Sequence, residues 1–89
     1  MLVLPTDLTR TQASACLQML VQGLRAEQGA TVVLDASALG RFDSAALAVL
    51  LEFRREGLAH GKSLAIRAMP QRLNDLAALY GISDLLPSA

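Results

Sequence analysis

The chain has 89 residues, which is enough for one hydrophobic core, so we expect a single domain over residues 1–89. Its eight basic and eight acidic residues cancel, which removes the broad positive field that nucleic-acid binding requires. Only 3 % of the residues are aromatic whereas 53 % are apolar, so Leu, Val, Ile and Ala must build the core.

The first half of the chain predicts a strand, a helix and a second strand. The apolar run LVLP, residues 2–5, is a short candidate strand that proline closes. A helix over about residues 9–28 follows, in which Thr9 and Gln12 have the spacing of a capping box. Its apolar stripe consists of Ala13, Cys16, Leu17, Leu20 and Leu24. The segment TVVLD, residues 31–35, predicts a strand that is buried on both faces.

The second half continues the alternation of helices and strands. A helix over about residues 44–60 ends at Gly61, and SLAIRA, residues 63–68, forms the next strand. A last helix over about residues 70–80 begins with proline in its first turn. Its apolar stripe consists of Leu73, Leu76, Ala77 and Tyr80. Short connections between these elements predict an α/β sandwich with a mixed, mostly parallel sheet of three to four strands.

The sequence offers little that could support catalysis. His60 is the only histidine and Cys16 the only cysteine, and they fall on different predicted helices, so a metal site is not expected. Sixteen residues of helix separate Ser44 from His60, a distance of about 24 Å that excludes direct proton transfer between them. No glycine-rich phosphate loop is present. The residues therefore favour neither a metal centre, nor a Ser-His-Asp hydrolase, nor a nucleotide-binding loop, and we expect no cofactor.

The start of the helix over residues 44–60 carries the main functional signal. Asp43 or Ser44 can cap this helix through a side-chain oxygen, a contact worth about 1 kcal/mol that needs no function. On a helical wheel, however, Ser44 shares an outward arc with small residues, whereas a solvated helix normally presents long charged ones there. The arc holds Ala45, Ala48, Glu52, Arg55 and Ala59, and Leu47 and Leu51 border it. This pattern favours a docking surface for another protein.

These residues resemble the STAS family, the sulfate-transporter and anti-sigma-factor-antagonist domains. The family signature is a strand that ends in Asp, a short loop, and an Asp-Ser or Asp-Thr pair that opens a helix. Asp35, Asp43 and Ser44 occupy those positions. The similarity is clear from Thr31 to Pro87, and the ending LAALYGISDLLP is most similar to the MlaB group. The resemblance implies a small STAS-like sandwich without enzyme activity.

The resemblance also implies a partner and a binding site. MlaB-like proteins bind the ATPase subunit of an ABC transporter that moves phospholipids and maintains outer-membrane lipid asymmetry. The expected partner-binding residues are Arg41, Phe42, Asp43, Ser44, Ala45, Leu47, Ala48 and Leu51. The alternative is an anti-sigma-factor antagonist, in which a partner kinase phosphorylates Ser44. A third reading, a small-ligand binder, has no phosphate loop to support it.

The sequence departs from the family pattern at two places, and the second of them bears on assembly. Ala45 and Ala46 stand where relatives carry a glycine, and the chain before residue 9 has room for only one strand where the family has two. The sequence is therefore compatible with a homodimer, in which an unpaired sheet edge pairs with a second copy of the chain.

The sequence has neither a secretory segment nor an apolar run of the roughly 20 residues that span a bilayer. We therefore expect a cytoplasmic protein that reaches the inner membrane through its partner and does not insert into the membrane.

Overall fold

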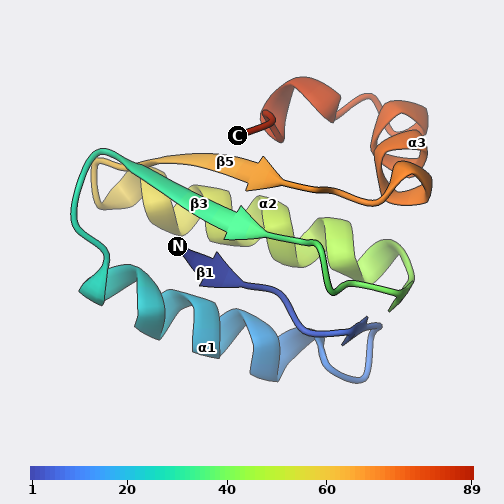
Figure 1. Ribbon diagram of the computed structural model, residues 1–89, viewed down its shortest axis with the longest axis horizontal. Helices are drawn as coiled ribbons and strands as arrows, with labels where there is room; N and C mark the ends of the chain where they lie inside the picture. Colours follow the sequence, from blue (N-terminus) through green and yellow to red (C-terminus); the bar gives the residue numbers. More distant parts are fainter.

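The computed structural model describes all 89 residues and contains three α-helices and five short strands (Figure 1). The helices are α1 (Ala13–Ala26), α2 (Ser44–Ala59) and α3 (Gln71–Leu79), and a 3-10 turn, η1 (Ser83–Leu85), follows them. The strands are β1 (Leu2–Val3), β2 (Asp7–Leu8), β3 (Thr31–Asp35), β4 (Arg41–Phe42) and β5 (Ser63–Arg67). The predicted α/β class is confirmed.

The strands form two parallel sheets. The larger has the order β1-β3-β5, and the smaller pairs β2 with β4. The expectation of a single strand before the first helix was wrong, because β1 and β2 both precede α1. Each has only two residues on either side of Pro5, which is too short for the alternation that marks a strand in a sequence.

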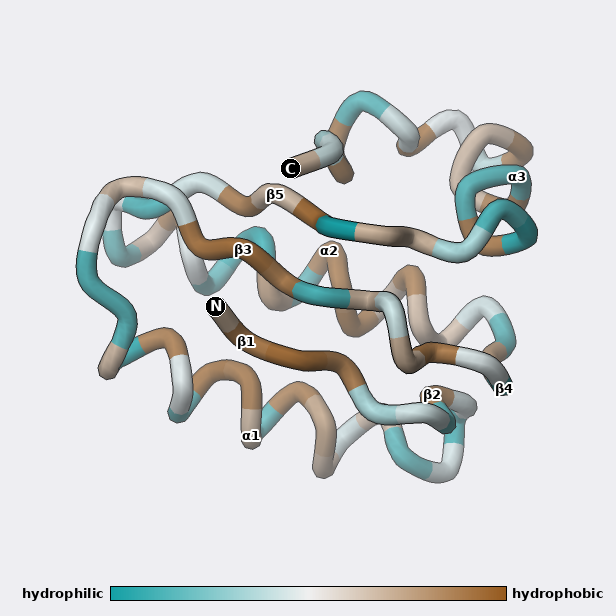
Figure 2. Tube along the Cα trace, in the orientation of Figure 1, coloured by the Kyte–Doolittle hydropathy of each residue, from teal (hydrophilic) through white to brown (hydrophobic).

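Both long helices cover the same face of the larger sheet. In Figure 1, β3 and β5 lie in front, α2 lies behind them, and α1 runs beside β1. The residues between these helices and the sheet belong to one cluster of 19 buried residues, to which α3 and several loops also contribute. In Figure 2 the chain is hydrophobic along β1 and β3 and on parts of the turns of α1 and α2, the elements that enclose this core. The chain therefore forms two layers, one of helices and one of strands.

The other face of the larger sheet is not covered by a helix. Val32 and Leu34 of β3 are buried, whereas Thr31 is exposed and Val33 and Asp35 are half-buried. The prediction that this strand is buried on both faces was therefore wrong. Adjacent valines occur both in strands with two covered faces and in strands with one covered face. The number of helices that pack against the sheet decides between these two outcomes.

The edges of the larger sheet are treated differently. The C-terminus runs along β5, where Ile66 N donates to the Pro87 oxygen at 2.8 Å and Ala89 N donates to the Ile66 oxygen at 2.9 Å. On the other side, β1 pairs only with Leu34 and Asp35 of β3. β1 therefore pairs with only part of this edge of β3. Self-association of the domain through this edge stays a prediction.

Helix boundaries differ from the predicted ones mainly at the first helix. Thr9 and Gln12 form a turn that precedes α1, because Gln12 Oε1 accepts hydrogen bonds from the Thr9 backbone N–H at 2.9 Å and hydroxyl at 2.6 Å. The helix itself begins at Ala13. Gly61 and Gly81 adopt positive φ values of 73° and 72° directly after α2 and α3, as glycine does at helix ends. Tyr80, predicted on the apolar stripe of the last helix, is 58 % exposed.

Candidate functional site

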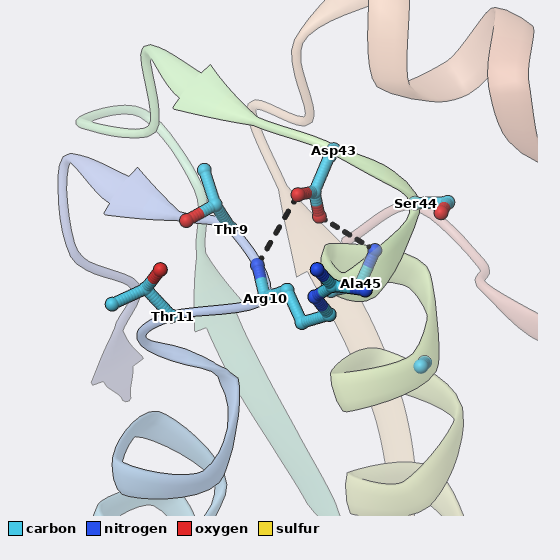
Figure 3. A pocket seen from close by; sticks show the side chains of 7 residues that line it. Thr9, Arg10, Thr11, Asp43, Ser44 and Ala45 are labelled. Atoms are coloured by element: carbon cyan, nitrogen blue, oxygen red, sulfur yellow. Dashed lines mark hydrogen bonds between the residues drawn. The ribbon is translucent and has the colours of Figure 1, made fainter.

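Asp43 joins two separate segments of the chain at the start of α2. It is the N-cap residue, and its Oδ1 accepts a hydrogen bond from the Ala45 backbone N–H at 2.8 Å. Its Oδ2 accepts from the backbone N–H of Arg10 at 3.2 Å. Figure 3 shows the carboxylate between these two donors. The side chain therefore caps the helix and also ties down the loop that leads into α1.

Replacing Asp43 with alanine should destabilise the fold by about 1–2 kcal/mol, because the variant loses a helix cap and a link between two segments. Chemical denaturation of the two proteins measures this difference. Asp75→Ala is the control, because the Asp75 carboxylate accepts only from the Gln71 side chain on the surface of α3. A change at Asp43 no larger than the change at Asp75 would contradict the dual role of Asp43.

Ser44 is the first residue of α2, and its side chain is exposed. No hydrogen bond engages its hydroxyl, in contrast to the carboxylate of Asp43 beside it. In Figure 3 the Ser44 side chain points away from the contact between Asp43 and Arg10. The capping role therefore belongs to Asp43, and the hydroxyl of Ser44 is free to contact another molecule.

A pocket of about 550 Å³ lies beside this helix start, and we call it the Ser44 pocket. Its lining residues are Thr9, Arg10, Thr11, Asp43, Ser44, Ala45 and Ala48. Four of the residues predicted for the site, Asp43, Ser44, Ala45 and Ala48, are thus brought together. The loop over residues 9–11 was missed, because its pairing with Asp43 is a tertiary contact. Its only signal in the sequence is a polar Thr-Arg-Thr run before an apolar helix.

The other predicted site residues do not line the Ser44 pocket. Arg41 is exposed on β4, and the half-buried Phe42 lies under the guanidinium of Arg72, 4.9 Å from its ring centre. Leu51 is half-buried and packs against the core. The expectation that Leu47 borders the surface was wrong, since its side chain is only 3 % exposed. Because α2 packs against α1, β5 and α3, its buried arc is wider than a single neighbour would produce.

Asp35 ends β3, and its carboxylate stabilises the loop that follows. Its Oδ1 accepts a hydrogen bond from the Ser37 backbone N–H at 3.0 Å. This bond, followed by one from the Ser37 side chain, lowers the pKa of Asp35 below its ordinary value. The residue that matches the family signature at this strand end therefore orders the β3–β4 connection and does not line the Ser44 pocket.

We expect Asp35 to stabilise the fold in a pH-dependent way. A carboxyl whose pKa is lowered by folding stabilises the native state above its unfolded pKa of about 3.9. That contribution is lost as the pH falls through the lower folded pKa. The difference in unfolding free energy between the native protein and Asp35→Asn should therefore be constant near pH 7 and shrink below about pH 4. Denaturant titrations across this range measure it, and a difference that grows on acidification would contradict the assignment.

The surroundings of Cys16 and His60, the one cysteine and the one histidine of the chain, point to structural roles. Cys16 is buried on α1, and burial raises the pKa of its thiol, which disfavours the reactive thiolate. His60 lies at the C-terminal end of α2, with its Nδ1 2.9 Å from the backbone oxygen of Glu56.

None of the helices has the length and apolar character needed to cross a membrane.

Comparison with known proteins assigns the family. A family model described as "Mlab, STAS domain" matches residues 1–87, which is nearly the whole chain. A search of curated proteins finds no significant match. The match agrees with the strand ending in Asp35, the Asp43 cap and the exposed Ser44 that open α2. The chain therefore belongs to the STAS domain family and is MlaB-like.

Proposed function

We propose that this protein is a non-enzymatic docking subunit that binds the ATPase subunit of a phospholipid-transporting ABC system through the surface around Ser44. Membership of the MlaB-like STAS family supports a regulatory or scaffold role. The observation that carries the proposal is that Ser44 is exposed, unbonded and next to a pocket of about 550 Å³. Attachment to the membrane would then come from the partner complex.

The shape of this surface suits protein docking. Ala45 and Ala48 line the Ser44 pocket, and their methyl side chains allow the backbone of a partner to approach α2 closely. Thr9, Thr11 and Ser44 supply hydroxyl groups that can donate or accept hydrogen bonds. A partner can therefore bury this area while the polar groups at its margin keep hydrogen-bond partners.

Ser44→Glu tests the proposal in a binding assay with the purified ATPase subunit. The added carboxylate would have to be buried at the contact next to Asp43, and we expect affinity to fall at least about 100-fold. Ser44→Ala keeps the small side chain and should stay within about tenfold of the native affinity. Circular dichroism checks that both variants are folded. Native affinity in Ser44→Glu, or no binding by the native protein, would overturn the proposal.

The free hydroxyl of Ser44 favours a second candidate function, a partner-exchange switch of the anti-sigma-antagonist type. A kinase could reach this exposed side chain, and the phosphate would carry close to two negative charges beside the Asp43 carboxylate. Mass spectrometry of the protein isolated from growing and stressed cells decides between the two candidates. Phosphate on Ser44 would support the switch, and its complete absence in all conditions would remove it.

A further inference from the structure

The loop side of the Ser44 pocket has no helix or strand of its own to hold it in place. Its three lining residues, Thr9, Arg10 and Thr11, lie in the turn between β2 and α1. In Figure 3 this turn faces the start of α2. Backbone outside regular structure keeps one conformation only where other contacts fix it. The shape of this side of the pocket therefore depends on the hydrogen bonds within and around the turn.

Gln12 makes most of these hydrogen bonds. Its Oε1 accepts from the backbone N–H and the hydroxyl of Thr9, at 2.9 Å and 2.6 Å. Its backbone N–H donates to the Thr9 backbone oxygen at 3.0 Å. Its backbone oxygen accepts from the N–H of the buried Cys16 at 2.9 Å, which joins the turn to α1. Gln12 therefore closes the turn and also anchors it to the helix that follows.

Asp43 is the only other residue whose side chain is hydrogen-bonded to the turn. Its Oδ2 accepts from the Arg10 backbone N–H at 3.2 Å, and this contact is exposed. The two bonds that the Gln12 side chain accepts are shorter and partly buried. Gln12 itself does not line the Ser44 pocket. Its side chain therefore acts on the pocket only through the turn residues that it holds.

We infer that Gln12 is a positioning residue of the docking surface, which holds the turn over residues 9–11 in the conformation that the partner ATPase binds. The inference rests on the proposed function, because it concerns how the same surface is kept ready for that partner. A loop that is ordered in the free protein does not have to be ordered on binding, so preorganisation raises affinity without a new contact. Removal of the Gln12 acceptor should therefore weaken binding.

Gln12→Ala and Gln12→Glu form a matched pair for a binding assay with the purified ATPase subunit. Alanine removes the acceptor, and we expect the affinity to fall about tenfold. Glutamate keeps an acceptor oxygen, and the Gln12 Nε2 that it replaces makes no hydrogen bond within the protein. This variant should therefore recover binding to within about twofold of the native affinity.

Gln18→Ala is the control for the loss of a glutamine side chain from α1. Gln18 is exposed and lines none of the pockets. Its replacement should leave the affinity within about twofold of the native value. A loss in Gln18→Ala as large as the loss in Gln12→Ala would overturn the inference.

Amide exchange in the free proteins separates local positioning from a general loss of stability. We expect the Arg10 amide to exchange faster in Gln12→Ala than in the native protein, and at the native rate in Gln12→Glu. Circular dichroism checks that both variants are folded at the assay temperature. Faster exchange in a folded variant shows that the turn opens locally, and native exchange at Arg10 in Gln12→Ala would overturn the inference.

The outcomes also separate this inference from the proposed function. Native affinity in Gln12→Ala, together with lost binding in Ser44→Glu, would overturn the positioning role and leave the docking role intact. Equal losses in Gln12→Ala and Gln12→Glu would likewise overturn it, because the accepted hydrogen bonds would not be the cause. An absence of binding by the native protein would overturn both.

Discussion

Replacing Ala48 with tryptophan should weaken binding of the ATPase subunit by at least about 100-fold, or about 2.7 kcal/mol. Ala48 is exposed and lines both the Ser44 pocket and a second pocket of about 320 Å³ between α1 and α2. An indole at this position would occupy space on the surface to which we propose that the ATPase subunit binds. Because the side chain points to solvent, the fold itself should change in stability by less than about 0.5 kcal/mol. Isothermal titration calorimetry measures the binding, and thermal unfolding measures the stability.

Ala59→Trp provides the control for this substitution. Ala59 is also an exposed alanine of α2, but it lies in the last turn of the helix and lines no pocket. The same side chain at this end should leave the affinity for the ATPase within about twofold of the native value. Equal losses from the two tryptophans would contradict a docking surface confined to the start of α2.

Replacing Phe53 with alanine should destabilise the domain by about 3–5 kcal/mol. Phe53 is only 1 % exposed and is the largest of the fully buried side chains of the core. Its removal leaves a cavity that the surrounding leucines can fill only in part. For a domain of this size, each kcal/mol lowers the melting temperature by about 4–8 °C, so the variant should melt at least about 12 °C lower. Differential scanning calorimetry measures the shift.

Leu58→Ala is the matched control on the same helix. Leu58 is 51 % exposed, so the loss of its side chain should change the stability by less than about 1 kcal/mol. A similar loss of stability in the two variants would contradict the placement of α2, because it would mean that both faces of this helix contribute equally to the core.

Helices were the part of this fold that the sequence predicted best. The second helix was expected over residues 44–60 and spans Ser44–Ala59, because an aspartate cap and a glycine stop flank a clear apolar stripe. The first helix starts four residues later than expected, at Ala13. The Thr9–Gln12 pair has the spacing of a capping box, but its hydrogen bonds close a separate turn. Local spacing alone does not distinguish these two outcomes.

The short strands could not be predicted in the same way. β2 and β4 have two residues each and exist because they pair with each other. Such pairs depend on contacts between segments far apart in the chain, and a two-residue segment carries no periodicity of its own. The uncovered face of β3 could not be predicted for the same reason, since its valines do not reveal how many helices lie against the sheet.

The candidate site was predictable on the α2 side and not on the loop side. The helical wheel correctly placed Ser44 and Ala48 at the surface, because the 3.6-residue period is a local property. It misplaced Leu47, because burial on that flank depends on which elements α2 packs against. Arg10 entered the site only through the hydrogen bond between its backbone and Asp43.

Hydrogen–deuterium exchange on the complex with the ATPase subunit tests the docking surface most directly. Amide protons slow their exchange where a bound partner excludes water and suppresses local opening. We expect slower exchange in residues 9–14, which span the loop and the start of α1, and in the first half of α2, with little change in α3 and along the uncovered face of the sheet. Slower exchange confined to α3 and η1, or to β3 and β5, would contradict it.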